Sequence, residues 1–220
     1  MKVKKKGLFI GVLVAMVVTL AAVSGYYWYK NAHYVDTEDA SVTGTIVKVS
    51  PQVTSRLIEI NVGEGDTVRA GDIIARQDDI SLPTATSVDL TVIKAPIKGT
   101  ILKKVGNVGE VGTPGSAVVM MADLSDLYIT ANVEETDLYK VKLGQKVDFT
   151  VDSIPGINFY GEVYSLGEAT ASTFSLLPAQ NTSGSFTKVV QRVPVKISIK
   201  NNQGQRLLPG MNAIVRIHVK

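Results

Sequence analysis

Two related stretches decide the fold, Pro51-Gln52-Val53-Thr54-Ser55-Arg56-Leu57-Ile58 and Ala95-Pro96-Ile97-Lys98-Gly99-Thr100-Ile101-Leu102. Each leads into a turn rich in glycine, Gly65-Asp66 to Gly71-Asp72 in the first and Gly109-Glu110 to Gly115-Ser116 in the second. One constant offset of 44 residues aligns them, so that Ser55 matches Gly99 and Gly65 matches Gly109. Because the offset holds at both ends, the chain contains an internal repeat without insertions.

Each half of the repeat has the pattern of a short strand, a tight turn and a second short strand. Residues 57–62 alternate, with Ile58, Ile60 and Val62 on one face, as in a half-buried strand. The glycines suit positive φ, and the acidic residue beside Gly65 or Gly109 can accept hydrogen bonds from turn amides. We expect the halves to face each other as a small β-sandwich, which resembles the lipoyl and biotinyl domains.

The composition narrows the class of protein. The 220 residues suffice for one or two domains, and 45% hydrophobic residues with a mean hydropathy of +0.17 is high for a soluble protein. The chain has no cysteine, which excludes disulfides and thiolate metal sites. Lys2, Lys4, Lys5 and Lys6 account for the formal charge of +3, since without these four lysines the charge is −1. A nearly neutral folded part gives little support to nucleic-acid binding.

The N-terminal region predicts a membrane anchor. No charged residue occurs from Gly7 to Tyr29, and a helix of that length, at about 1.5 Å per residue, spans a bilayer. The preceding lysines and the aromatic cluster 26–29 indicate a cytoplasmic N-terminus, with everything from residue 30 onward outside. The anchor residues are Gly7, Leu8, Tyr26 and Trp28. The alternative is a signal peptide cleaved near residues 22–24.

The connection between the two halves excludes one function. Lipoyl and biotinyl carriers hold their modified lysine there, but no lysine occurs between Arg76 and Lys94. The connection also contains Pro83 and many β-branched or small polar residues. Such a segment cannot make two helices or a heptad seam, so we expect a short loop at 80–90.

The remainder of the chain predicts a small antiparallel β-barrel. Strands are expected at 127–133, 147–151, 159–166, 189–199 and 211–219, with the early strand 41–49 completing the barrel. Residues 30–40 read as a polar exit linker. One helical turn at 134–139 is expected to be capped near Asn132 or Thr136, and 143–146 reads as a turn.

Several segments resemble HlyD/EmrA-type membrane fusion proteins. They are Asp36–Gly44, Ile46–Ser55, Phe174–Asn181, Lys188–Ile197 and Leu207–Met211. The resemblance implies an adaptor without a cofactor that forms homo-oligomers and serves an inner-membrane exporter of the major-facilitator type. Most of that family carries a coiled-coil hairpin between the two halves, which here is missing or reduced to a loop. Direct contact with an outer-membrane channel is therefore not expected.

These observations predict a mainly β protein with four parts. Residues 1–30 are the cytoplasmic tail and transmembrane anchor, and 31–49 the linker and first strand. Residues 50–123 form the lipoyl-like domain, a barrel-sandwich hybrid with halves 50–79 and 91–123, and 124–220 form the β-barrel. The chain is expected in the cytoplasmic (inner) membrane as a single-pass protein.

The candidate contact motif lies in the barrel. It comprises Gln180, Asn181, Lys188, Gln191 and Arg192, which would contact either the substrate or the exporter. The alternative is a solvated barrel face, because single arginines on strands are usually solvated. Residues 193, 195 and 197 look only imperfectly in phase as its buried side.

Signatures of enzyme chemistry are lacking in the sequence. His33 and His218 have no cysteine or Glu-x-x-His partner, and Gly63-Glu64-Gly65 lacks the third glycine of a dinucleotide loop. The sequence therefore predicts a non-enzymatic adaptor of multidrug or toxic-compound efflux. Two alternatives stay open, which are an adaptor for an ATP-driven exporter of peptides or bacteriocins and an anchored scaffold without a role in transport.

Overall fold

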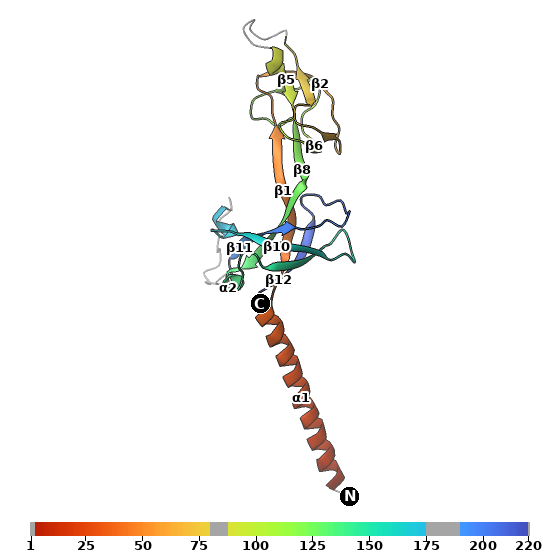
Figure 1. Cartoon of the computed structure of the whole chain (residues 1–220), viewed down its shortest axis with the longest axis vertical. Helices are drawn as coiled ribbons and strands as arrows, with labels where there is room; N and C mark the ends of the chain where they lie inside the picture. Colours follow the sequence, from red (N-terminus) through yellow and green to blue (C-terminus); the bar gives the residue numbers. More distant parts are fainter. Residues whose placement is uncertain (1–2, 80–87, 175–189, 220) are drawn as a thin grey trace, which may run out of the picture. The chain divides into compact units, whose positions relative to one another are not determined.

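The structure, a computed structural model, describes residues 3–79, 88–174 and 190–219 and is built mostly of strands (Figure 1). The helices are α1 (Val3–His33), α2 (Glu135–Leu138) and the short 3-10 helices η1 (Val88–Thr91) and η2 (Ala171–Phe174). The strands are β1 (Tyr34–Val49), β2 (Ser55–Ile60), β3 (Thr67–Val68), β4 (Ile73–Gln77), β5 (Val92–Lys94), β6 (Gly99–Lys104), β7 (Val111–Gly112), β8 (Val119–Glu134), β9 (Lys146–Val151), β10 (Phe159–Leu166), β11 (Arg192–Ile199) and β12 (Asn212–His218). This confirms the predicted mainly β class with an N-terminal apolar helix.

The chain divides into two compact units. The barrel unit comprises Met1–Ser41, Ile129–Gly204 and Asn212–Lys220, and the sandwich unit comprises Val42–Tyr128 and Gln205–Met211. The long strands β1 and β8 each contribute to both units, so a single strand serves two cores. The domain boundaries proposed from the sequence stay predictions.

The sandwich unit confirms the repeat. Strand β2 pairs with β7 through Ser55↔Gly112, and 44 residues later β6 pairs with β3 through Gly99↔Val68. The turn of each half also donates a backbone hydrogen bond to a strand of the other half. The amide of Gly65 donates to the carbonyl of Ile101 at 2.8 Å, and that of Gly109 donates to the carbonyl of Leu57 at 2.7 Å. Each half thus completes the strand of the other, which a half alone could not do.

The turn chemistry is the one that the sequence predicted. Gly65 and Gly109 have φ of 92° and 93°, a region that only glycine adopts readily. Asp66 Oδ2 accepts a hydrogen bond from the amide of Gly63 at 2.7 Å, and Glu110 Oε2 accepts one from Asn107 at 3.0 Å. The hydrogen bonds from Asn107, first from its side-chain amide and then from its backbone amide, hold the pKa of the Glu110 carboxyl below its ordinary value.

The predicted alternation of β2 is wrong in one respect. Leu57 is buried and Ile58 is exposed, although the sequence pattern placed Ile58 on the buried face. The register between β2 and β4 shifts between Leu57 and Glu59, so a bulge changes the phase: Leu57 is in the core, and Ile60 and Val62 pack against it while Ile58 does not.

The connection between the halves is short. Strand β4 ends at Gln77 and β5 begins at Val92, and η1 takes up the last residues before β5. The predicted loop at 80–90 lies for the most part outside the described residues. The span from 78 to 91 is too short for a helical hairpin, because each arm of a coiled coil needs several heptads.

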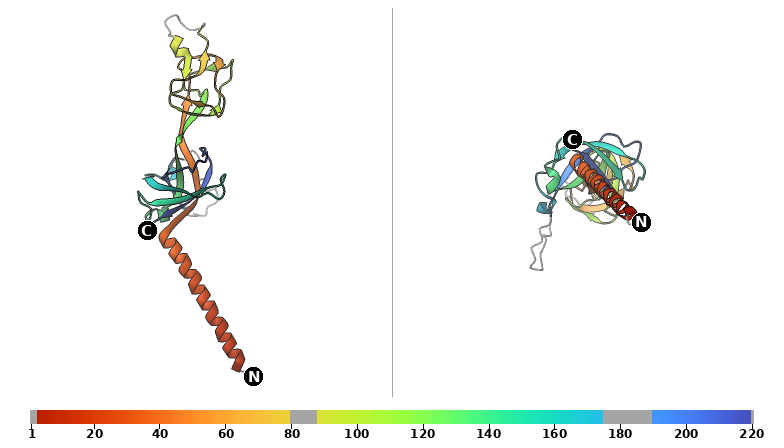
Figure 2. Two further views of the ribbon diagram at one scale, coloured as in Figure 1. Left: turned by 45° about the vertical axis from the view of Figure 1, so that its right-hand side comes forward. Right: turned by 90° about the horizontal axis from the view of Figure 1, so that it is seen from below.

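The barrel unit has six strands in the order β1-β12-β9-β10-β11-β8, and pairing of β8 with β1 closes the ring. Figure 2 shows these strands from the side and from below. The stacked rings of Phe149 and Phe159, 5.4 Å apart, fill the interior together with Val195 and Ile197. Closure leaves the barrel without an unpaired edge.

Several local predictions in the barrel need correction. Strand β1 begins at Tyr34, directly after α1, so residues 35–40 are strand and not linker. They pair with β12, with a register shift between Thr37 and Ala40, so the first half of β1 completes the barrel and the predicted strand 41–49 does not, since residues 42–49 belong to the sandwich unit. The N-cap of α2 is Glu134, which makes no side-chain cap hydrogen bond, whereas the predicted caps lie elsewhere, Asn132 in β8 and Thr136 within α2. The residues 193, 195 and 197 are all buried and hence fully in phase.

Candidate functional site

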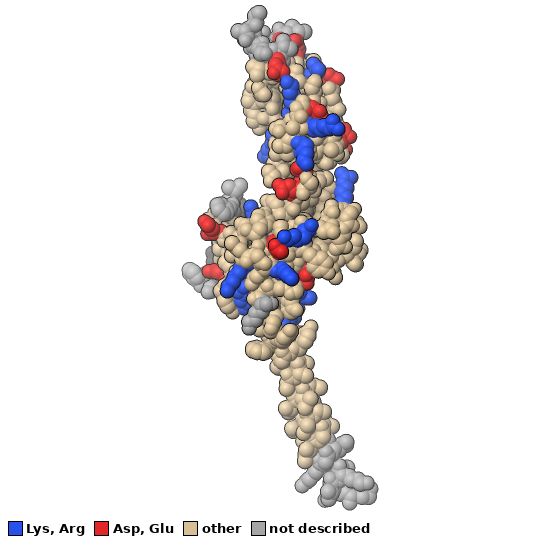
Figure 3. Space-filling model, viewed as in Figure 1, with Lys and Arg blue, Asp and Glu red and all other residues tan. Residues whose placement is uncertain are grey.

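The first candidate element is the anchor helix. Among the described residues, α1 alone is long and apolar enough to cross a membrane, over Phe9–His33. Gly7 and Leu8 lie in its first turns. Tyr26 and Trp28 lie near its end and expose 66% and 75% of their surfaces. On the face shown in Figure 3 the apolar part of α1 carries no Lys, Arg, Asp or Glu, whereas charges of both signs are interspersed over the strands; Lys30 lies in the last turn of the helix.

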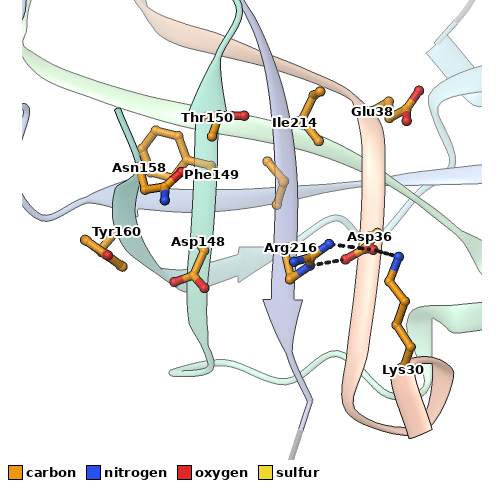
Figure 4. A pocket seen from close by; sticks show the side chains of 11 residues that line it. Lys30, Asp36, Glu38, Asp148, Phe149, Thr150, Asn158, Tyr160, Ile214 and Arg216 are labelled. Atoms are coloured by element: carbon orange, nitrogen blue, oxygen red, sulfur yellow. Dashed lines mark hydrogen bonds and ion pairs between the residues drawn. The ribbon is translucent and has the colours of Figure 1, made fainter. Parts of the chain in front are cut away.

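A three-residue ion cluster lies where α1 passes into β1. The Asp36 carboxylate accepts hydrogen bonds from Arg216 Nε at 2.9 Å and Nη2 at 3.3 Å, and Lys30 Nζ lies 2.8 Å away (Figure 4). Burial alone would raise the pKa of Asp36, but the bonds from Arg216 and Lys30 outweigh it and hold the pKa below its ordinary value. Arg216 also lies over the ring of Tyr34, 5.6 Å from its centre.

A shallow hollow of about 360 Å³ lies beside this cluster on the outer face of the barrel. Figure 4 shows the side chains of Asp148, Thr150, Tyr160 and Ile214 lying along it, from β9, β10 and β12. The described residues contain no group of three His, Asp or Glu side chains that could hold a metal ion. The hollow is thus a mixed polar and apolar surface without metal-site chemistry.

The candidate motif is partly visible. Arg192, at the start of β11, forms an ion pair with Asp39 of β1, and both side chains are 46% exposed. Asn132 Nδ2 also donates to Asp39, at 3.1 Å. Arg192 therefore links β11 to β1 near the pairing that closes the barrel.

Gln191 is held on both sides. Its carbonyl accepts the amide of Glu135 at 2.9 Å, and its side chain bonds to Ser172. The other motif residues, Gln180, Asn181 and Lys188, lie outside the described residues. The structure thus brings Gln191 and Arg192 together with β1 and α2, and a contact role for the motif stays a prediction.

Sequence reasoning missed the acidic partners of these arginines. Asp36 and Asp39 were assigned to a linker, so their pairing with Arg216 and Arg192 was not foreseen. The alternation of Asp36 and Glu38 with Val35 and Thr37 has the period of a strand and could have indicated it. A polar strand is difficult to distinguish from a linker without knowledge of its partner.

Two family models match nearly the whole β part. Residues 45–123 match the barrel-sandwich hybrid domain of RND membrane fusion proteins, and residues 127–217 match the YknX-like beta-barrel domain. The "Putative efflux system component YhbJ" of Bacillus subtilis (strain 168) is 39% identical over 188 residues, which are 86% of this chain and 81% of YhbJ. The colistin resistance protein EmrA of Acinetobacter baumannii is 35% identical over 136 residues, 60% of this chain and 38% of that protein.

Solved structures show the same fold. The periplasmic adaptor protein EmrA matches with a TM-score of 0.56 at 15% identity, covering 84% of this chain and 98% of that one. A MacA-MexA chimeric protein with the Pseudomonas aeruginosa MexA hairpin matches with a TM-score of 0.67 at 19% identity, covering 86% and 82%.

A barrel-sandwich hybrid joined to a small closed barrel defines the class of efflux adaptors. This chain belongs to the membrane fusion protein family and is EmrA-like, with the hairpin reduced to a short connection. It spans most of YhbJ but little more than a third of the Acinetobacter EmrA.

Proposed function

We propose that this protein is the membrane-anchored adaptor of a multidrug or toxic-compound efflux system and works with a major-facilitator exporter. The observation that carries the proposal is the 39% identity to an efflux component over most of both chains. The fold supports it, because both β modules of the adaptor class are present.

The exporter class rests on the EmrA-like relatives. They include the multidrug export protein EmrA of Escherichia coli (strain K12), 30% identical over 135 residues, besides the Acinetobacter protein named for colistin resistance. Those names point to amphipathic or toxic compounds as cargo. The family model that matches the barrel is named after YknX and not after an EmrA-type protein. This match therefore does not favour the major-facilitator class of exporter.

The anchor rests on α1 and its flanks. The apolar span, the preceding lysines and the exposed aromatic residues 26–29 favour a helix that stays in the inner membrane with its N-terminus inside. The two β units would then stand outside, beside the exit of the exporter, and assemble with further copies of the chain. The adaptor itself would do no covalent chemistry, and the ion gradient used by the exporter would supply the energy.

A pull-down of the tagged full-length protein from its native membranes in mild detergent, read by mass spectrometry, tests this function. A stoichiometric major-facilitator protein is the expected result. An ATP-binding-cassette permease would keep the adaptor role and replace the energy source. If no transporter came down even after cross-linking, the efflux role would be refuted in favour of an anchored scaffold.

The contact motif needs a test that spares the barrel. Because β11 begins at Arg192, deleting residues 174–197 would remove a barrel strand and would not isolate the motif. Replacing Gln180, Asn181 and Lys188 by alanine leaves every described strand intact. We expect loss of export and of exporter capture, with unchanged barrel stability. Full export by this variant would exclude Gln180, Asn181 and Lys188 as contact residues.

A further inference from the structure

The end of the barrel that receives α1 carries an exposed loop, residues 139–146, called here the basal loop. Its location follows from strand register. Val35, the second residue of β1, pairs with Ile217, and Ile217 pairs with Val147 at the start of β9. The basal loop leads directly into β9 and therefore lies at the end of the barrel where α1 joins β1.

A hydrogen bond also places the basal loop beside the C-terminal end of α1. Lys140 Nζ donates to the carbonyl of Asn31 at 3.3 Å, and Asn31 follows the aromatic residues 26–29 closely. The chain also returns here, since the amide of Val219 donates to the carbonyl of His33 at 2.9 Å. If α1 spans the bilayer, the basal loop is at the level of the lipid headgroups.

The side chains of the loop suit that level. Tyr139 and Leu143 expose 76% and 64% of their surfaces to solvent. Between Tyr139 and Lys146 the sequence contains three lysines and no acidic residue, and Lys142 and Lys146 are exposed. Aromatic, leucine and lysine side chains together are the composition of protein segments that lie in the membrane interface.

The loop is also preorganised. The Gln145 side chain accepts the amide of Lys142 at 2.8 Å and donates to the carbonyl of Lys140 at 3.0 Å. Gly144 has φ of 80°, and its amide donates to the carbonyl of Val163 at 2.8 Å, which attaches the loop to β10. Val141 is buried beneath. The exposed Leu143 is therefore held outward by a fixed backbone, so its insertion into lipid needs no ordering of the loop.

We propose that the basal loop is a second membrane contact, in which Tyr139 and Leu143 enter the headgroup layer and Lys142 and Lys146 bind anionic lipid phosphates. Asp137, the acidic residue that precedes the loop most closely, is engaged by Lys140 at 2.7 Å. The contact would fix the tilt of the barrel above the membrane, which a single helix cannot do. The proposal rests on the anchoring part of the proposed function.

The cysteine-free chain allows a direct test in the full-length protein. Leu143→Cys, labelled with an environment-sensitive fluorophore, is reconstituted into vesicles of phosphatidylethanolamine and phosphatidylglycerol that contain lipids brominated near the headgroup. The matched control is Asp152→Cys, an exposed position just after the far end of the same strand β9. We expect quenching and a blue-shifted emission at 143 and neither at 152. Equal, unquenched emission at both positions would overturn the proposal.

The fluorescence of Trp28, the single tryptophan of the chain, distinguishes failure of the loop contact from failure of the membrane anchor. Trp28 lies near the end of α1, and its own fluorescence in unlabelled protein reports on the anchor. Quenched Trp28 with unquenched 143 refutes the loop contact and leaves the anchor intact. Unquenched Trp28 refutes the anchor itself. Protection of 143 that arises only when an exporter is co-reconstituted would also overturn the lipid contact and assign the loop to the exporter.

The lysines are tested by lipid charge. Replacing Lys142 and Lys146 by glutamine in the labelled protein should reduce quenching at 143 in vesicles with phosphatidylglycerol and change little in phosphatidylcholine alone. Each lysine at an anionic surface corresponds to about a fivefold change in association. Identical quenching of the parent and glutamine variants in the anionic vesicles would overturn the electrostatic part.

Discussion

Gly99→Ala should destabilise the sandwich unit, although it adds only one methyl group. A Cβ at Gly99 would lie 2.5 Å from the carbonyl oxygen of Ala122 and 2.9 Å from its carbon. These atoms belong to the backbone of β8 and cannot rotate away. The equivalent position in the first half is Ser55, whose hydroxyl donates to the carbonyl of Asp78 at 2.5 Å. In the first half, Ser55 forms a hydrogen bond to the neighbouring backbone at this position, whereas in the second half Gly99 leaves room for it.

The size of the effect follows from two opposing terms. Forcing a methyl group into a packed site costs about 1–3 kcal/mol, because strands β6 and β8 must separate. Alanine also restricts the unfolded chain, which returns about 0.4–1 kcal/mol. The free energy of unfolding of the sandwich unit should fall by about 1–2 kcal/mol, which raises the population of opened β6 about 5- to 30-fold.

Hydrogen exchange of the full-length protein in detergent, read by mass spectrometry, measures this directly. Peptides covering β6 and the start of β8 should exchange faster in Gly99→Ala, whereas peptides of β9 in the barrel unit serve as an internal reference. Gly63→Ala is the matched control, because its Cβ would meet nothing closer than Asp66 Oδ2 at 3.5 Å. If Gly99→Ala exchanged like Gly63→Ala, the backbone clash would not exist and the packing argument would be refuted.

Three further predictions concern polar groups. Because the pKa of Asp36 is lowered in the folded protein, its stabilising effect is present above the ordinary value of about 4 and is lost as the pH falls through the folded pKa. Asp36→Asn should therefore weaken the fall of the barrel's melting temperature at acidic pH. An unchanged fall would contradict the role of Arg216. The coupling energy of the half-exposed pair Asp39–Arg192 should be less than about 1 kcal/mol in a double-mutant cycle with alanine, measured by urea unfolding. A larger coupling energy would mean that the pair holds the barrel closed. Gln77→Glu should lower the free energy of unfolding by about 2–4 kcal/mol in guanidinium, because Gln77 Nε2 donates to two carbonyl oxygens in the sandwich core and a carboxylate would repel both. A variant as stable as the wild type would show that the site is hydrated.

The repeat could be predicted because its determinants are local. Gly65 and Gly109 are required by positive φ, and Asp66 and Glu110 cap their own turns, so the sequence carries the whole signal. The start of β1 could not be predicted in this way. Asp36 belongs to a strand because Arg216, 180 positions later, lies opposite it in β12. Pattern reasoning sees only the polar, acidic run and reads it as a linker.

The candidate site was predictable to a similar extent. The motif identified Arg192 as unusual, but its partner Asp39 comes from a segment that had no assigned strand. The basal loop gave even less signal, since YKVKLGQK reads as an ordinary turn. Its interest comes from strand register, which brings the loop to the same end of the barrel as Val35. Register depends on pairings between residues distant in sequence and is not available from a local pattern.

The halves of the repeat show which features the fold requires and which are left to function. Both halves use the same backbone hydrogen bonds, yet the buried Gln77 of the first half corresponds to the fully buried Met121 of the second. The glycines and the acidic caps are therefore common to both halves, whereas buried side chains such as Gln77 and Met121 differ between them. The hydrogen bonds that join Gly65 to Ile101 and Gly109 to Leu57 do not involve the connection between the halves, so its length can change without disturbing either half.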